Sequence, residues 1–180
     1  EHFTAPGETQ SCLEYSIGCG GKGLNQSIAL SLAGILVFHA GIIGGDGLFL
    51  RDKLNEKGVN TDFIKVVDGH CGHAIIEVSS SGQNRILLYP GTNHLVDKDF
   101  VDSVLKHFRT DDIVVLQNEI TGMEYIINKC REKGLKIVFN GAPVNEKILS
   151  YPIEKTDWLI VNEVEGAALS GESDNDKIPH

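Results

Sequence analysis

The hydrophobic residues of this chain follow two spacings that alternate along the sequence. Residues 35–43 and 112–117 are nearly continuous apolar runs, which is typical of strands that are covered on both faces. Residues 24–32 and 47–57 carry apolar side chains at helical spacing, and Gly58 is placed to end the second helix. This alternation predicts an α/β fold, a doubly wound and mostly parallel sheet with helices on both faces.

The same alternation continues through the second half of the chain. Helices are expected at residues 97–108, 121–133 and 163–169, with strands at 136–140 and 158–161 between them. Asp97 is a candidate N-cap. Thr121 and Glu124 have the spacing of a capping box at the start of the middle helix.

The region between these two parts has a different pattern, with three short strand candidates at residues 63–67, 74–79 and 85–89. A polar connection with a glycine, residues 80–83, joins the last two and predicts a hairpin. Residues 12–17 alternate apolar and polar side chains as well. We therefore expect a small β-sheet lid, built from residues near 11–17 and 73–90, beside the main sheet.

Composition excludes several classes of protein. The chain has 180 residues and a formal net charge of −9, without a dense Lys/Arg run, which argues against nucleic-acid binding. No apolar run reaches the length of a membrane span, and residues 1–10 lack a signal-peptide core. The cysteines show no C-x-x-C pair and no disulfide framework, so reduced thiols and a cytoplasmic location are expected. They are Cys12, Cys19, Cys71 and Cys130.

Residues 18–23, Gly-Cys-Gly-Gly-Lys-Gly, are the densest chemical signal in the chain. They fit the dinucleotide fingerprint G-x-G-x-x-G, but that motif needs an acidic residue at the end of the next strand, and Asp46 lies past that point. They also fail as a P-loop, because Lys22 is followed by Gly23 instead of the Ser or Thr that holds magnesium.

A third interpretation uses more of the sequence. Residues 20–26, GGKGLNQ, resemble the first signature of the PfkB-type carbohydrate kinases, the family that includes ribokinase. Five further segments resemble family segments and occur in the family's order. They are PGET at 6–9, GIIGGDG at 41–47, GVNT at 58–61, YPGTN at 89–93 and NEVE at 162–165.

The resemblance implies an ATP-dependent kinase that phosphorylates a sugar hydroxyl, with D-ribose and its 5-hydroxyl as the expected substrate. It implies ATP and Mg²⁺ as cofactors, with a monovalent cation as a further option, and a homodimer formed through the lid. Two alternatives stay open. One is another PfkB kinase that acts on fructose, a keto-deoxy sugar acid or a nucleoside, and the other is a sugar-binding protein without catalysis.

The sugar-binding candidates by this resemblance are Gly21, Lys22, Gly23, Asn25 and Glu119. Glycines let a backbone approach a polyhydroxylated ligand closely, and Asn25 offers both a donor and an acceptor for neighbouring hydroxyls. The plainer interpretations are a glycine-rich corner with a solvated Lys22, and an acidic Glu119 that favours the following helix N-terminus.

Asn162 and Glu165 follow the last predicted strand. The resemblance places Asn162 near the nucleotide phosphates and lets Glu165 act on the metal through a magnesium-bound water. Their spacing also fits an N-cap with a capping box, and both roles can hold at once.

The catalytic base of the family is an Asp in a G-A-G-D segment, and the sequence contains no such segment. The resemblance therefore places the base beyond His180. It also implies that the first strand and the C-terminal ATP-binding part are missing, so that residues 1–180 form a single partial domain that is inactive alone. Without that strand we expect unpaired sheet edges and a chain that is marginally stable or associates with itself.

Overall fold

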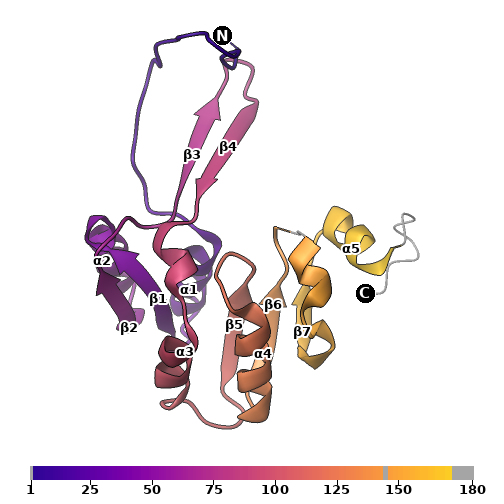
Figure 1. The fold of residues 1–180 in the computed structure, drawn as a ribbon. Coiled ribbons are helices and arrows are strands. Elements are labelled where there is room, and N and C mark those ends of the chain that lie inside the picture. The colour runs from indigo at the N-terminus through magenta and orange to yellow at the C-terminus, as the bar shows by residue number, and fades with distance from the viewer. Residues whose placement is uncertain (1, 144–145, 172–180) are drawn as a thin grey trace. The chain divides into compact units, whose positions relative to one another are not determined.

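A computed structural model describes residues 2–143 and 146–171 of the chain. It divides into two compact units, Glu1–Thr92 and Asn93–His180, each of which is described separately (Figure 1). The single partial domain expected from the sequence stays a prediction.

The first unit contains a parallel pair of strands connected through a helix. β1 (Phe38–Gly44) and β2 (Asn60–Val67) pair in parallel, with Ala40 opposite Phe63. Before them lies α1 (Lys22–Leu32), and between them lie a short 3₁₀ helix (Gly45–Gly47) and α2 (Leu48–Glu56). One buried cluster of this part consists of Leu24, Val37, Leu54 and Val59.

The strand expected at residues 35–43 begins later than its apolar pattern indicates. Gly34 adopts a left-handed φ of 86°, and the Ile35 N–H donates to the Leu30 carbonyl, so these residues close the end of α1. Ile35 and Leu36 are exposed, and the apolar run forms β1 only from Phe38 onward.

The predicted hairpin is present, with β3 (His73–Val78) and β4 (Asn84–Tyr89) paired antiparallel. The prediction of a lid strand at residues 12–17 is wrong, because this segment is irregular and no strand of the described residues pairs with it. Leu13, Tyr15 and Ile17 are 92%, 80% and 73% exposed. Alternating side chains fit a strand, but a strand also needs a hydrogen-bonded neighbour, and here the hairpin has two strands only.

The second unit combines a parallel sheet with helices. The sheet has the order β5 (Ile113–Gln117), β6 (Lys136–Asn140) and β7 (Trp158–Ile160), with every pairing parallel. The helices are α3 (Lys98–Leu105), α4 (Met123–Glu132) and α5 (Glu163–Ser170), and short 3₁₀ helices occur at Gly91–Leu95, Glu146–Ser150 and Ile153–Lys155. Helix α4 packs on β6, and the core of the unit includes Ile127, Cys130, Ile137 and Phe139. No helix of the described residues has the length and apolar character needed to cross a membrane.

Two helix starts in this unit test the capping predictions. Asp97 caps α3 as expected, since its side chain accepts the Phe100 N–H at 2.8 Å. The capping box expected at Thr121 is wrong, because α4 begins after Gly122 in a left-handed conformation. The Thr121 hydroxyl instead donates to the carbonyls of His94 and Val96, at 3.2 and 2.8 Å.

Candidate functional site

The glycine-rich segment leads directly into the first turn of α1. Gly21 is the N-cap residue with φ 98° and makes no side-chain cap, and its carbonyl accepts the Asn25 N–H at 3.0 Å. Lys22 and Gly23 are the first two helical residues, and Asn25 is exposed on the same turn. The first amides of a helix have no intrahelical acceptor, so this turn presents N–H donors beside a lysine and a carboxamide.

The glycines of this segment are not required by packing against the protein. A Cβ added at Gly18, Gly20 or Gly21 would meet no atom within 4 Å. Only Gly21 needs glycine for its backbone conformation, because its φ lies in the region that side chains disfavour. A polar ligand can approach the main chain closely only where such open space exists.

Glu119, Asn162 and Glu165 lie at the carboxyl edge of the three-stranded sheet in the second unit. Glu119 is half-buried in the turn after β5, and Asn162 follows β7. Parallel strands end at the same edge, and ligands of open α/β sheets bind outside that edge. Glu119 and Asn162 follow strands that are two positions apart in the sheet, which corresponds to roughly 10 Å.

Asn162 and Glu165 form the capping box that their spacing allows. The Asn162 Oδ1 accepts the Glu165 N–H at 2.9 Å, and the Glu165 Oε2 accepts the Asn162 N–H at 3.0 Å. This arrangement orients both side chains at the N-terminus of α5. The cap uses one oxygen of the Glu165 carboxylate, and the other can still accept hydrogen bonds from water.

The structure therefore groups the predicted site residues in two sets. Gly21, Lys22, Gly23 and Asn25 share one turn of the first unit, while Glu119, Asn162 and Glu165 share one sheet edge of the second. The roles in sugar, nucleotide and metal binding stay predictions. Within residues 2–143 and 146–171, no three His, Cys, Asp or Glu side chains gather closely enough to hold a metal ion directly.

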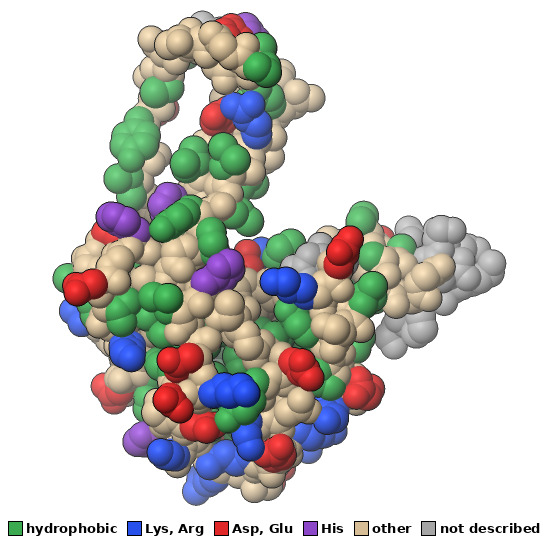
Figure 2. Space-filling view, in the orientation of Figure 1, with side chains coloured by type: hydrophobic (Ala, Val, Ile, Leu, Met, Phe, Trp, Pro, Cys, Tyr) green, Lys and Arg blue, Asp and Glu red, His purple; other side chains and the backbone are tan. Residues whose placement is uncertain are grey.

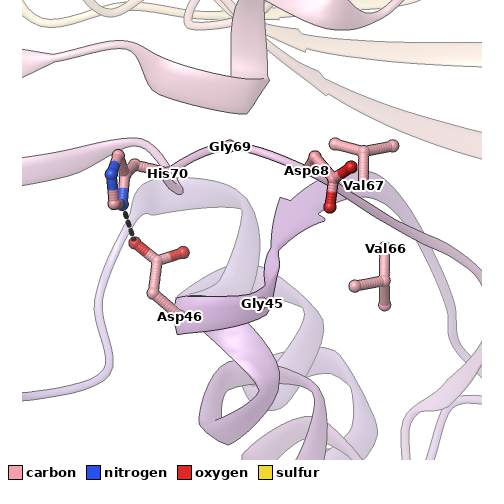
Figure 3. A pocket seen from close by; sticks show the side chains of 7 residues that line it. All are labelled: Gly45, Asp46, Val66, Val67, Asp68, Gly69 and His70. Atoms are coloured by element: carbon pink, nitrogen blue, oxygen red, sulfur yellow. Dashed lines mark hydrogen bonds and ion pairs between the residues drawn. The ribbon is translucent and has the colours of Figure 1, made fainter.

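The base of the hairpin is a junction whose contact with Asp46 the sequence did not predict. Asp46 accepts hydrogen bonds from the Cys71 N–H at 3.0 Å and pairs with the His70 Nδ1 at 3.1 Å (Figure 3). The hydrogen bond from the Cys71 N–H holds the pKa of the Asp46 carboxyl below its usual range; burial opposes this shift, and the His70 ring adds a smaller lowering effect. These side chains border an open pocket of about 570 Å³, lined also by Gly45, Gly69 and residues 66–68.

The junction is tightly packed on its protein side. A Cβ on Gly47 would lie 2.1 Å from the Cys71 Sγ, and one on Gly91 would lie 2.4 Å from the His70 carbonyl. Thr92 is fully buried, and its hydroxyl donates to the Ile42 carbonyl at 2.7 Å. In the sequence, the glycines of the GIIGGDG segment allow this close approach but do not reveal its partner.

Comparison with known proteins adds independent evidence. Residues 1–178 match the pfkB family carbohydrate kinase. The ribokinase of Haemophilus influenzae is 31% identical over 178 residues, which are 94% of this chain and 57% of that protein. A deoxyribokinase of Salmonella typhi is 30% identical over 172 residues, 92% of this chain and 56% of its own length. The chain thus spans somewhat more than half the length of these relatives.

Solved structures agree with this result. The ribokinase of Cryptococcus neoformans in complex with ADP superposes with a TM-score of 0.80 at 31% identity, over 98% of this chain and 58% of that one. The Arabidopsis thaliana ribokinase complexed with ribose and ATP gives 0.78 at 25% identity, over 95% and 57%. The fold is ribokinase-like, and the chain belongs to the pfkB family of carbohydrate kinases.

Proposed function

We propose that this chain provides the sugar-facing part of an ATP-dependent kinase that phosphorylates the 5-hydroxyl of D-ribose. The observation that carries the proposal is the uncapped, sterically open turn at Gly21, which the packing of the protein does not explain. Its support from outside the chain is the set of ribokinases at about 30% identity.

The proposed sugar site uses complementary donors and acceptors. Lys22 and the first amides of α1 donate, while the Asn25 carboxamide can donate and accept, which suits a pair of neighbouring hydroxyls. The Glu119 carboxylate accepts from a further hydroxyl. Several directed hydrogen bonds hold the sugar in one orientation, so that a single hydroxyl is presented for transfer.

The proposed nucleotide side lies at the N-terminus of α5. Asn162 is assigned to the phosphates of ATP, and Glu165 to a water molecule bound to Mg²⁺, through the oxygen that its capping bond leaves available. When bound, Mg²⁺ neutralises charge that develops on the transferred phosphoryl group. We assign no catalytic base within the 180 residues; by the family resemblance, this role belongs to an Asp in a G-A-G-D segment.

The hairpin is proposed to close over the sugar and to form a homodimer interface. In the β3–β4 register, one face of the hairpin carries the Glu77–Arg85 ion pair, and the other is apolar except for Asn84, which lies opposite Val78. The apolar face consists of Ala74, Ile76, Val78, Ile86 and Leu88, whose four larger side chains are 51–68% exposed. Apolar side chains gather along the hairpin in Figure 2. A two-stranded hairpin is marginally stable by itself, so this face favours a covering partner.

The oligomer proposal has a direct test. We expect the protein expressed from its complete gene to sediment as a dimer and Leu88→Lys to shift it toward monomer, because a lysine would be buried in an apolar interface. Glu77→Lys on the opposite face is the matched control and should leave the dimer intact. Identical sedimentation of Leu88→Lys and the unmodified protein would contradict the assigned face.

Substrate choice needs a kinetic test, because one relative is a deoxyribokinase. We would measure ADP release by the protein expressed from its complete gene with ribose, 2-deoxyribose, fructose, 2-keto-3-deoxygluconate and adenosine. The proposal expects the highest kcat/KM with ribose. A clear preference for another compound would overturn ribose as the substrate but would leave the proposed kinase activity in place. Ribose binding in a calorimeter without any turnover would contradict the kinase itself and favour a sugar-binding protein.

A further inference from the structure

Asn118 is a buried polar residue that no proposed step above uses. It follows β5 directly, is 7% exposed, and lies next to Glu119. Its side-chain nitrogen donates to the Pro143 carbonyl at 2.7 Å and to the Gly141 carbonyl at 3.4 Å. The carboxamide thus connects the turn after β5 to the loop after β6.

The acceptors of this carboxamide lie on a well-anchored loop. β5 and β6 end in register, with Gln117 opposite Asn140. The Gly141 N–H donates to the Ile160 carbonyl at 3.1 Å and extends the pairing toward β7. A Cβ on Gly141 would lie 2.9 Å from the Cδ1 of Ile148, which is fully buried, so the main chain at Gly141 packs closely against that side chain.

The other end of the same turn is anchored by Thr121. Its hydroxyl donates to the Val96 carbonyl at 2.8 Å and to the His94 carbonyl at 3.2 Å, while its N–H donates to the Asn93 carbonyl at 3.4 Å. Glu119 therefore lies on a short turn that is fastened on both sides, by Asn118 and by Thr121. Fixed supports of this kind hold a binding side chain in one position.

We propose that Asn118 is a positioning residue for Glu119: its two carbonyl contacts set the direction in which the chain leaves β5 and so the place of the Glu119 carboxylate at the sugar. The proposal rests on the proposed function, because it assigns Glu119 to sugar binding. It adds a residue whose side chain touches the protein and acts on the ligand through its neighbour.

The chemistry requires a donor at this position. A carboxamide nitrogen carries two N–H groups and can serve two carbonyl oxygens at once. A carboxylate has nearly the same shape but accepts only, so it would face two carbonyl oxygens without a proton between them. Burial and this repulsion would raise the pKa of an introduced carboxyl group, and its protonation would restore one donor.

The test is the pH dependence of ribose affinity in Asn118→Asp. The introduced carboxyl repels the loop where it is ionised and donates one hydrogen bond where it is protonated. We therefore expect its ribose Kd to exceed that of the unmodified protein about tenfold at pH 7.5, the size of one lost hydrogen bond. The difference in ribose Kd between Asn118→Asp and the unmodified protein should narrow as the pH falls toward 5. In the variant, kcat at saturating ribose should change less than KM.

The matched control is Asn128→Asp, which makes the same charge change on α4. The Asn128 Oδ1 accepts from the Lys155 Nζ, so an acid is accommodated there. Calorimetry of all three proteins, from pH 5 to 8 and well below their unfolding temperatures, should show the pH-dependent difference in Kd in Asn118→Asp alone. Equal affinities across this range would overturn the proposal. Should Asn118→Asp not fold, Asn118→Ser, which keeps one donor, is expected to raise Kd by a smaller factor.

A spectroscopic measurement keeps this idea separate from the proposed function. In ¹⁵N spectra without sugar, Asn118→Asp should move the Glu119 backbone amide in a pH-dependent manner, while Asn128→Asp should not. If this shift occurs but the unmodified protein binds no ribose, the positioning of Glu119 stands and the sugar assignment fails. If ribose binds and the Glu119 amide does not move, Asn118 has no positioning role.

Discussion

The carboxylate of Asp46 accepts the main-chain N–H of Cys71 at 3.0 Å, across 25 residues of sequence. In return, the Cys71 sulfur accepts the Gly44 N–H at 3.1 Å. The segment that leads into β3 is therefore fastened to the end of β1 from both sides. These two contacts anchor Cys71, two residues before β3 begins.

The Asp46 contact should contribute to stability in a pH-dependent manner. The pKa of Asp46 is lowered in the folded protein, chiefly by the Cys71 N–H; burial opposes this shift, and His70 adds a smaller lowering effect. Its contribution is therefore present above the ordinary carboxyl pKa of about 4 and is lost as the pH falls through the lower folded value. Urea unfolding from pH 6 to 2 should show a smaller loss of stability in Asp46→Asn. Parallel profiles for the two proteins would contradict this role.

Gly47→Ala should destabilise the first unit by about 1–3 kcal/mol, which is typical of overpacking. The new Cβ would lie 2.1 Å from the Cys71 Sγ and 3.3 Å from the Ile43 Cβ. Gly45→Ala is the control, since its Cβ would meet nothing within 4 Å. In denaturant unfolding, Cys71→Ala should lower the free energy of unfolding less in the Gly47→Ala protein than in the unmodified protein, because it removes the sulfur that the new Cβ would meet. Strictly additive losses would refute the predicted clash.

His39 should make stability fall in mildly acidic solution. Burial lowers its pKa below the usual value, and its Nδ1 lies 2.8 Å from the Ser27 hydroxyl. The unfolded chain therefore binds the proton more readily, so the free energy of unfolding decreases as the pH falls from about 7 to 5. His39→Gln should flatten this profile. Ser27→Ala should keep the pH dependence of stability, because burial and not the hydrogen bond to Ser27 lowers the pKa of His39. A flat pH profile in Ser27→Ala would show that the hydrogen bond is the cause.

The four cysteines should separate into two reactive and two protected thiols. Cys12 and Cys19 are exposed, whereas Cys71 and Cys130 are buried. Burial raises the pKa of Cys130 to about 12 and also raises that of Cys71, so neither forms the thiolate that reacts. An aromatic disulfide reagent at pH 8 should modify two thiols quickly in the folded protein and four in urea. Four fast thiols before unfolding would show that the buried pair is accessible.

The sequence predicted best those elements that have two agreeing local signals. β6 begins and ends where the sequence predicted, at Lys136 and Asn140, on either side of the apolar run at 137–139. α3 follows a predicted cap at Asp97, and α5 begins with the capping box formed by Asn162 and Glu165. Gly58, with φ 77°, follows the end of α2 as expected. Caps and periodicity involve neighbours within one or two turns, so the sequence pattern contains the complete interaction.

The errors occur where a second segment decides the outcome. Residues 12–17 alternate correctly for a strand but have no pairing partner among the described strands. Thr121 has capping-box spacing, yet its hydroxyl has better acceptors in the segment of His94 and Val96. Local spacing states which hydrogen bonds are possible, and the tertiary structure selects among them.

The sequence by itself determined the α/β alternation, the hairpin and, through ordered motifs, the pfkB family. Those features depend on short-range periodicity and on segments that resemble the family in order. Only the tertiary structure decided that Asp46 holds Cys71, that the glycine turn at Gly21 is open, and that Asn118 reaches the loop after β6. Each of these is a contact, or an absence of packing, between segments far apart in the chain, and it exists only once the strands have brought those segments together.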